Sequence, residues 1–175
     1  MSKTKDIIDE ALGAVELAKS EPKERKVIPR PQENDDIEND YKYQRENFYK
    51  ALGIFKLGDS EAFSVAFNQG TDPVFCKEYE LFKDTEEGVF IDKLSGAPLF
   101  DTKDRFNSRT GWLSFTKPVD GSVTEHMDYS YGMTRVEIKS KSSGIHLGHV
   151  FQDGPNGLPR YCINATVLEF VPRNI

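Results

Sequence analysis

The stretch RYCINATVLEFV, residues 160–171, is the part of the chain that most clearly indicates its fold class. Its residues are mainly β-branched, aromatic or aliphatic, which is typical of a strand, and a strand directs successive side chains to opposite faces. Arg160, Cys162 and Asn164 would therefore share one face, with Tyr161 and Ile163 on the other. The pattern predicts a strand that carries a thiol between a cation and an amide.

The sequence around this strand is organised as short apolar runs separated by Gly, Pro, Asp and Asn, from about residue 71 onward. Such punctuation is typical of a β domain with long loops. The runs that we expect to form strands are 88–92, 97–100, 136–139, 145–151 and 161–171. The sequence therefore predicts a mainly β fold.

The N-terminal part has a different character. Residues 6–19 have apolar residues at helical spacing, whereas residues 21–41 are charged, carry three prolines and have few side chains to bury, which indicates a flexible linker. Two further helices are expected over 41–52, which ends at a glycine, and over 60–67. We predict a helical and flexible extension over 1–45 and a folded domain over 46–175.

Composition limits the partners and the compartment. A net charge of −6 argues against nucleic acid or an anionic membrane as the main partner, and no stretch resembles a membrane span, a secretory signal or a transit peptide. The chain has only two cysteines, Cys76 and Cys162, too few for a disulfide scaffold. These features predict a protein of the reducing cytoplasm.

Cys162 has two interpretations at this point. An unpaired cysteine is commonly a small, buried apolar residue. The thiolate, however, is the nucleophilic form, and a guanidinium about 5 Å away at an effective dielectric of about 20 would make it the major species near neutral pH. Arg160 supplies such a cation on the same face, so burial and reactivity both stay open.

The three histidines lie between residues 126 and 149. His146 and His149 would face opposite sides of a regular strand, but a bulge at Gly148 would bring both rings to one side. They could be structural histidines, metal ligands together with His126 and Glu125, or acid–base groups beside the thiol. The spacing does not decide among these roles.

Several motifs, taken in order, resemble the signature of a known family. The motifs are Gly96-Ala97-Pro98-Leu99-Phe100, Thr110-Gly111-Trp112, Ser114-Phe115-Thr116-Lys117-Pro118, His146-Leu147-Gly148-His149-Val150-Phe151, Asp153-Gly154-Pro155 and Arg160-Tyr161-Cys162-Ile163-Asn164. Together they resemble the B-type peptide-methionine (R)-S-oxide reductases over roughly residues 57–172. The resemblance implies antiparallel sheets in a small, open barrel-like or tent-like domain, preceded by N-terminal helical segments.

The resemblance also implies catalytic roles. Cys162 matches the nucleophile that attacks the sulfoxide sulfur, releases methionine and becomes a sulfenic acid. His149 and Asn164 match residues that engage the sulfoxide oxygen, His146 lies in the same cluster, and Arg160 matches a residue beside the nucleophile. The implied activity reverses an oxidative change in proteins.

Substrate and partners follow in the same way. Trp112 matches the wall that holds the methyl group of the substrate, and we expect Phe115 and Phe151 to contribute to it; from composition alone, Trp112 and Phe115 could equally be core residues or loop anchors. The implied partners are proteins that contain methionine sulfoxide and thioredoxin or a similar dithiol. We expect a monomer that needs no cofactor.

The sequence departs from the family at the zinc positions, at the usual position of the resolving cysteine, and at Leu113, which stands where proline is usual. Many members bind zinc through two CxxC pairs, but the corresponding residues here are Asp92, Ser95, Ser140 and Ser143. Such a set cannot reproduce a four-thiolate site, so we predict no zinc. Thr110 stands where some members have a resolving cysteine; Cys76 is then either an incidental cysteine or an alternative resolving one.

Two other classes of protein use the same residue types. A thiol hydrolase would combine Cys162, His149 and Asn164, but it would also need an oxyanion hole, commonly at a helix N-terminus, whereas Cys162 is expected in a strand. A binding protein that keeps the fold without activity is the other alternative. A turnover assay separates all three.

Overall fold

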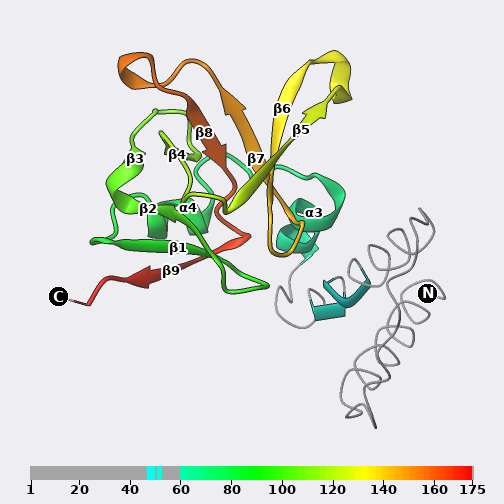
Figure 1. Ribbon diagram of the computed structural model, residues 1–175, viewed down its shortest axis with the longest axis horizontal. Helices are drawn as coiled ribbons and strands as arrows, with labels where there is room; N and C mark the ends of the chain where they lie inside the picture. Colours follow the sequence, from blue (N-terminus) through cyan, green and yellow to red (C-terminus); the bar gives the residue numbers. More distant parts are fainter. Residues whose placement is uncertain (1–46, 50, 53–59, 175) are drawn as a thin grey trace, which may run out of the picture. The chain divides into compact units, whose positions relative to one another are not determined.

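The computed structural model describes residues 47–49, 51–52 and 60–174 (Figure 1). Residues 47–49 and 51–52 are helical, which confirms the described part of the helix predicted over 41–52. The helix expected over 6–19, the linker over 21–41 and the extension over 1–45 lie outside the described residues. Among the described helices none is long and apolar enough to cross a membrane.

Residues from 60 onward are mainly β, with short helices. The helices are α3 (Ser60–Asn68) and α4 (Lys77–Phe82), and single 3-10 turns lie at η1 (Thr102–Asp104), η2 (Ser130–Gly132) and η3 (Pro155–Gly157). The strands are β1 (Gly88–Asp92), β2 (Pro98–Asp101), β3 (Arg105–Phe106), β4 (Leu113–Phe115), β5 (Val123–Asp128), β6 (Arg135–Ser140), β7 (His146–Phe151), β8 (Arg160–Ile163) and β9 (Leu168–Pro172).

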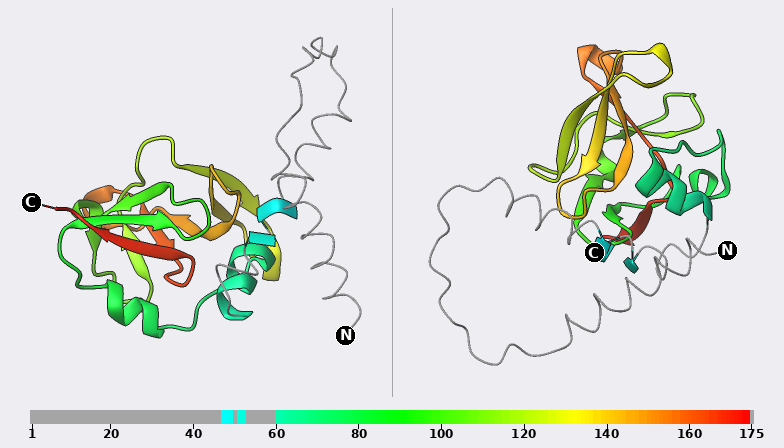
Figure 2. Two further views of the ribbon diagram at one scale, coloured as in Figure 1. Left: turned by 90° about the horizontal axis from the view of Figure 1, so that it is seen from below. Right: turned by 90° about the vertical axis from the view of Figure 1, so that its right-hand side faces the viewer.

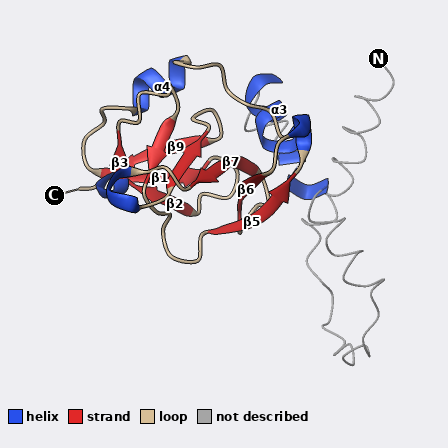
Figure 3. Cartoon of the chain, turned by 90° about the horizontal axis from the view of Figure 1, so that it is seen from above, coloured by secondary structure: helices blue, strands red, loops and turns tan. Residues whose placement is uncertain are grey.

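The strands form two antiparallel sheets (Figures 1 and 2). The smaller has the order β2-β1-β9, and the larger has the order β3-β4-β8-β7-β6-β5. Strands β3 and β5 each pair with one neighbour only, so the larger sheet stays open. Helix α3 contacts β7 at one end of this sheet (Figure 3). The prediction of a mainly β, antiparallel and open domain is confirmed.

An aromatic core joins the two sheets. Phe100 of β2 stacks on Phe115 of β4 with ring centroids 4.6 Å apart, and Phe90 of β1 meets Phe115 edge-on at 5.5 Å. All three side chains are fully buried, which is the environment that large aromatic side chains stabilise most. The ring of Phe115, which was expected to contribute to the substrate-binding wall, is part of this core.

The predicted strands 88–92, 97–100, 136–139 and 145–151 are confirmed to within one residue at each end. The run predicted over 161–171 is instead two strands, β8 and β9, in different sheets. The turn between them is held by the buried carboxylate of Asp72, which accepts hydrogen bonds from the backbone of Ala165 at 2.7 Å and of Thr166 at 3.1 Å. Asp72 is 93 residues from Ala165, so the alternation of side chains within residues 161–171 could not reveal this contact.

Candidate active site

A row of polar side chains crosses the larger sheet. Ser114 of β4 lies opposite Cys162 of β8, Cys162 lies opposite His149 of β7, and His149 lies opposite Glu137 of β6. Directly opposed residues of antiparallel strands project to the same face, with Cβ atoms about 5 Å apart. The register therefore sets the thiol between a hydroxyl and an imidazole.

A bulge brings the second imidazole to the same face. Strand β6 pairs Ile138 with Gly148 but Lys139 with His146, so Leu147 is an extra residue in β7. The rings of His146 and His149 consequently lie 5.4 Å apart. The predicted bulge is confirmed, but the extra residue is Leu147 and not Gly148.

Gly148 has a different function in this arrangement. A Cβ atom added to it would lie 1.9 Å from the carbonyl oxygen of Cys162. No atom fits at that distance, so β7 and β8 can approach this closely only because residue 148 has no side chain. Gly148 thus controls the position of the backbone that carries the thiol.

Each of the two buried imidazoles binds a carboxylate. His146 Nδ1 lies 2.6 Å from Glu137 Oε2, and His149 Nε2 lies 2.7 Å from Asp128 Oδ2. Burial lowers the pKa of His149, and the hydrogen bond to Asp128 offsets this only in part. His149 is therefore a neutral ring near pH 7, with Nε2–H donating to the carboxylate. His146 Nε2 is buried and has no hydrogen-bond partner among the described residues.

The two carboxylates were not among the predicted site residues. Hydrogen bonds from the side chain and backbone of Ser130, followed by the bond from His149, hold the pKa of Asp128 well below its usual range. Burial raises the pKa of Glu137, but the hydrogen bond and charge of His146 bring it below its usual value. Both groups are thus anions at neutral pH. Glu137 lies in a strand that also carries Arg135 and Lys139, so nothing in the local sequence indicated that its carboxylate is buried.

The third histidine does not join this pair. His126 is exposed, and its Nε2 lies 2.8 Å from the Thr124 hydroxyl. Within the part of the chain that the structure describes, no three His, Cys, Asp or Glu side chains are grouped so that they could hold a metal ion. The alternative in which His126, His146, His149 and Glu125 bind a metal is therefore not supported.

Arg160 lies near Cys162, but its positive charge is partly offset by Asp153. Its guanidinium binds Asp153 through two hydrogen bonds of 2.9 and 3.0 Å and lies 4.6 Å from the centre of the Phe151 ring. Burial raises the pKa of the Cys162 thiol; the positive charge of Arg160 lowers it without overcoming burial, and the Asp153 charge opposes Arg160. The expectation that thiolate is the major species in the free protein was wrong, because sequence spacing does not reveal burial or Asp153.

The side-chain amide of Asn164 is bonded to backbone. Its Oδ1 accepts a hydrogen bond of 2.8 Å from the Asp72 N–H, and its Nδ2 donates one of 2.9 Å to the carbonyl oxygen of Leu147. Leu147 is the extra residue of the bulge. In this structure Asn164 therefore positions the histidine-bearing segment, and its engagement of the sulfoxide oxygen stays a prediction.

Trp112 and Cys76 both contact Asp72, which lies in the loop before α4. The Trp112 indole N–H donates to the Asp72 carbonyl oxygen at 2.9 Å. The half-buried Cys76 caps the N-terminus of α4, a helix that was not predicted: its sulfur accepts the Tyr79 N–H at 3.4 Å and lies 3.8 Å from Asp72 Oδ2. Burial raises the pKa of the Cys76 thiol. Asp72 also binds the turn after β8, so it connects this loop to the strand of Cys162.

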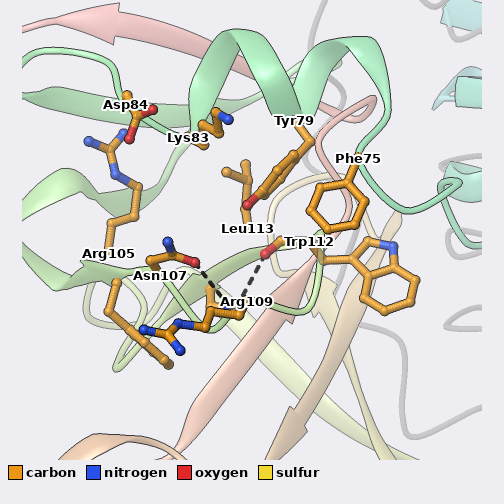
Figure 4. A pocket seen from close by; sticks show the side chains of 11 residues that line it. Phe75, Tyr79, Lys83, Asp84, Arg105, Asn107, Arg109, Trp112 and Leu113 are labelled. Carbon is orange, nitrogen blue, oxygen red and sulfur yellow. Dashed lines mark hydrogen bonds between the residues drawn. The ribbon is translucent and has the colours of Figure 1, made fainter.

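A cavity of about 410 Å³ adjoins Trp112 and Ser114 (Figure 4). The rings of Phe75 and Tyr79 line one side of it, and Asn107 and Arg109 line the other. Ser114 is also a member of the polar row described above. Cys162, which lies opposite Ser114 in β8, is not among the residues that line the cavity.

The four residues at the expected zinc positions form a hydrogen-bonded cluster. Ser143 Oγ donates to Asp92 Oδ2 at 2.5 Å, and Asp92 Oδ1 accepts the backbone N–H groups of Leu94 and Ser95. Ser142, next in the chain to Ser143, bonds through its hydroxyl to those of Ser95 and Ser140. One carboxylate already occupied by donors, with hydroxyls around it, does not fit a zinc ion.

Asp92→Ala is expected to lower the free energy of unfolding by about 2–4 kcal/mol, because it leaves buried donors without an acceptor. Chemical denaturation would measure this loss, with the exposed Asp120→Ala as the matched control.

Metal analysis of the purified wild-type protein is expected to find no stoichiometric zinc. A stoichiometric zinc content, or equal stability of the two variants, would contradict this account of the cluster.

The comparison with known families agrees with this geometry. A family model described as the SelR domain matches residues 59–172, which is well over half of the chain and contains every strand described above. That domain is the methionine-R-sulfoxide reductase B domain. The chain therefore belongs to the SelR-domain family, the B-type methionine-R-sulfoxide reductases.

Proposed function

We propose that the protein reduces the R epimer of protein-bound methionine sulfoxide through a thiol mechanism with Cys162 as the nucleophile. The observation that carries this proposal is the strand register, which sets Cys162 directly opposite His149, with His146 beside it. A nucleophile flanked by proton-handling groups is what sulfoxide reduction requires.

The reaction transfers one oxygen atom from sulfur to sulfur. The Cys162 thiolate attacks the sulfoxide sulfur and forms an Sγ–S bond, and the substrate oxygen takes up a proton from the enzyme. The oxygen then moves to Sγ as the Sγ–S bond and the S–O bond of the substrate break, so methionine leaves as a thioether and Cys162 carries a sulfenic acid. Over the whole regeneration, two thiols of an external dithiol become a disulfide, and the sulfenic acid is returned to thiol and water.

The oxygen needs a proton before it can leave the substrate sulfur. His146 is the better placed donor when its ring carries both protons: Nδ1–H is then bound to Glu137, and Nε2–H, which is buried and has no partner among the described residues, is left for the substrate oxygen. His149 gives its Nε2–H to Asp128 and, as a neutral ring, retains an acceptor at Nδ1. We assign proton donation to His146 and orientation of the polar cluster to His149.

Selection of one epimer requires two of the groups on the chiral sulfur to be recognised. We assign the methyl group to an apolar wall of Trp112, which is fixed by its bond to the Asp72 carbonyl, and Phe151, which is covered by the Arg160 guanidinium. The oxygen is assigned to the histidine side. A substrate with the opposite configuration would put its oxygen or its polypeptide arm against the wall.

The direct test is turnover of dabsyl-methionine sulfoxide with dithiothreitol, run separately on the R and S epimers. We expect reduction of the R epimer and no significant reduction of the S epimer. Absence of turnover with either epimer would refute the proposed function. It would favour the inactive binding protein with this fold.

Arg160→Met is expected to move the activity to higher pH. The thiolate is the reactive form, so the rate rises with pH through the pKa of Cys162; removal of the Arg160 charge, which lowers that pKa, raises it further. At neutral pH the rate should fall about tenfold or more, with recovery at alkaline pH. The pH profile of kcat/KM measures this, with the exposed Lys117→Met as control. An unshifted profile would remove the electrostatic role of Arg160.

Cys76 is proposed as the residue that resolves the sulfenic acid. The support is its place on the loop that Asp72 connects to the turn after β8. A single turnover without reductant should leave one disulfide and no free thiol, as counted with a thiol reagent. A stable sulfenic acid with one free thiol would instead show that an external dithiol attacks Cys162 directly.

The remaining assignments concern the setting of the enzyme. We propose that it acts in the cytoplasm as a monomer on oxidised proteins, which is repair of oxidative damage, and that thioredoxin or a similar dithiol regenerates it. The net charge of −6 and the small number of cysteines support this setting. The proposed catalytic unit is the domain over 46–175, with 1–45 as an extension.

A further inference from the structure

Gln69, which immediately follows helix α3, reaches the carboxylate next to the active site. Its Nε2 lies 3.1 Å from both Oε1 and Oε2 of Glu137. Gln69 is an exposed residue, whereas Glu137 is only 2% exposed. A surface side chain thus makes a part-buried contact with the partner of His146.

The backbone of Gln69 is held in a disfavoured conformation. Gln69 has a φ of 53°, in the left-handed region where a non-glycine residue is disfavoured by about 1 kcal/mol or more. The first residue after a helix is one where glycine is the usual solution, and Gly70 follows directly. Retention of a long amide side chain here is consistent with a function for the amide.

Glu137 is surrounded by several charged or titratable groups. His146 binds it at 2.6 Å, Lys139 Nζ lies 3.8 Å from its Oε1, and His126 lies opposite it in β5. On the other side, His149 faces it in β7. Asp128, which binds His149, also forms an ion pair with Arg135. Gln69 is the uncharged donor in this set.

A buried carboxylate stays ionised only if donors compensate for the lost water. We infer that Gln69 is a positioning residue that keeps Glu137 anionic, so that Glu137 holds His146 Nδ1 and leaves His146 Nε2 directed to the substrate. This inference rests on the proposed function. It makes the end of α3 part of the active-site support, at a position outside every motif of the family resemblance.

Two substitutions separate this role from simple packing. Gln69→Gly removes the donor but relieves the left-handed backbone, so the variant should fold. Gln69→Lys retains a donor and adds a positive charge. If the amide acts on Glu137, the glycine variant should raise the pKa of Glu137, and the lysine variant should not raise it. The exposed neighbour, as Asn68→Gly and Asn68→Lys, provides the matched controls.

The measurements are the carboxyl ¹³C NMR titration of Glu137 and the pH profile of kcat/KM. For Gln69→Gly we expect the Glu137 titration to move to higher pH by about half a unit or more, and kcat/KM to fall further at the acidic end of the profile, below the limb that reports the Cys162 thiol. For Gln69→Lys and both Asn68 variants we expect no upward movement.

An unmoved Glu137 titration in Gln69→Gly would overturn the inference, as would an equal upward shift in the glycine and lysine variants. The titration does not depend on turnover. Failure of the wild-type protein to reduce methionine sulfoxide would therefore refute the proposed function separately, while the effect of Gln69 on Glu137 would still be read.

Discussion

Cys162→Ser is expected to reduce turnover of methionine-R-sulfoxide below detection, by at least about 10³-fold. A serine hydroxyl is much less acidic than a thiol and holds its proton at every accessible pH, and the resulting oxygen cannot accept the substrate oxygen as a sulfenic acid. The side chain is otherwise similar in size, so the strand register with Ser114 and His149 should persist. The assay is the epimer-resolved reduction described above.

The matched control is Cys76→Ser, because it removes the only other thiol of the chain. This variant should complete a first turnover at the wild-type rate, whatever thiol then regenerates Cys162. Substantial steady-state activity of Cys162→Ser with dithiothreitol would remove the nucleophile assignment. A first turnover lost equally in both variants would remove the distinction between nucleophile and resolving thiol.

Gly148→Ala is expected to be the most damaging substitution outside the reacting groups. The added Cβ would meet the Cys162 carbonyl oxygen at 1.9 Å, so β7 and β8 would have to separate at the thiol. We expect a loss of about 3 kcal/mol or more in the free energy of unfolding. Activity should fall at least about 100-fold in the fraction that still folds, because the thiol and both histidines depend on this pairing.

Gly144→Ala is the comparison for this prediction. Gly144 has nothing within 4 Å of an added Cβ, and its φ of 76° alone should cost about 1–2 kcal/mol. Chemical denaturation and the R-epimer assay on both variants separate backbone strain from collision. Equal losses in the two variants would contradict the role given to the close approach at Gly148.

Much of the catalytic face was predictable because it depends on local alternation. The period of two in a strand puts Arg160 and Cys162 on one face, and a glycine within β7 indicated the irregularity that unites His146 and His149. The same rule could have corrected Phe115: once β4 begins at Leu113, Phe115 must share the face of Leu113 and not that of Ser114. No strand was predicted over residues 113–115, so the rule was not applied there.

The rest depended on contacts between distant parts of the chain. His149 binds a carboxylate 21 residues away and Asn164 accepts a bond from a residue 92 away, and neither partner is part of a recognisable motif with it. The state of the thiol could not be predicted for the same reason. The protonation state of Cys162 depends on burial and on the Asp153 charge as well as on Arg160. Of these three influences, only the Arg160 charge was evident from the spacing along the strand.

The cluster of Asp92, Ser95, Ser140 and Ser143 has a consequence for exposure to oxidants, which the proposed function entails. Thiolates at these four positions could be oxidised to disulfides or sulfenic acids, which would break the connection between the two turns. A carboxylate and hydroxyls have no such chemistry. The chain therefore has only two thiols for peroxide to oxidise, and one of them is the proposed nucleophile. The hydrogen bonds that join the turn after β1 to the turn after β6 contain no oxidisable sulfur.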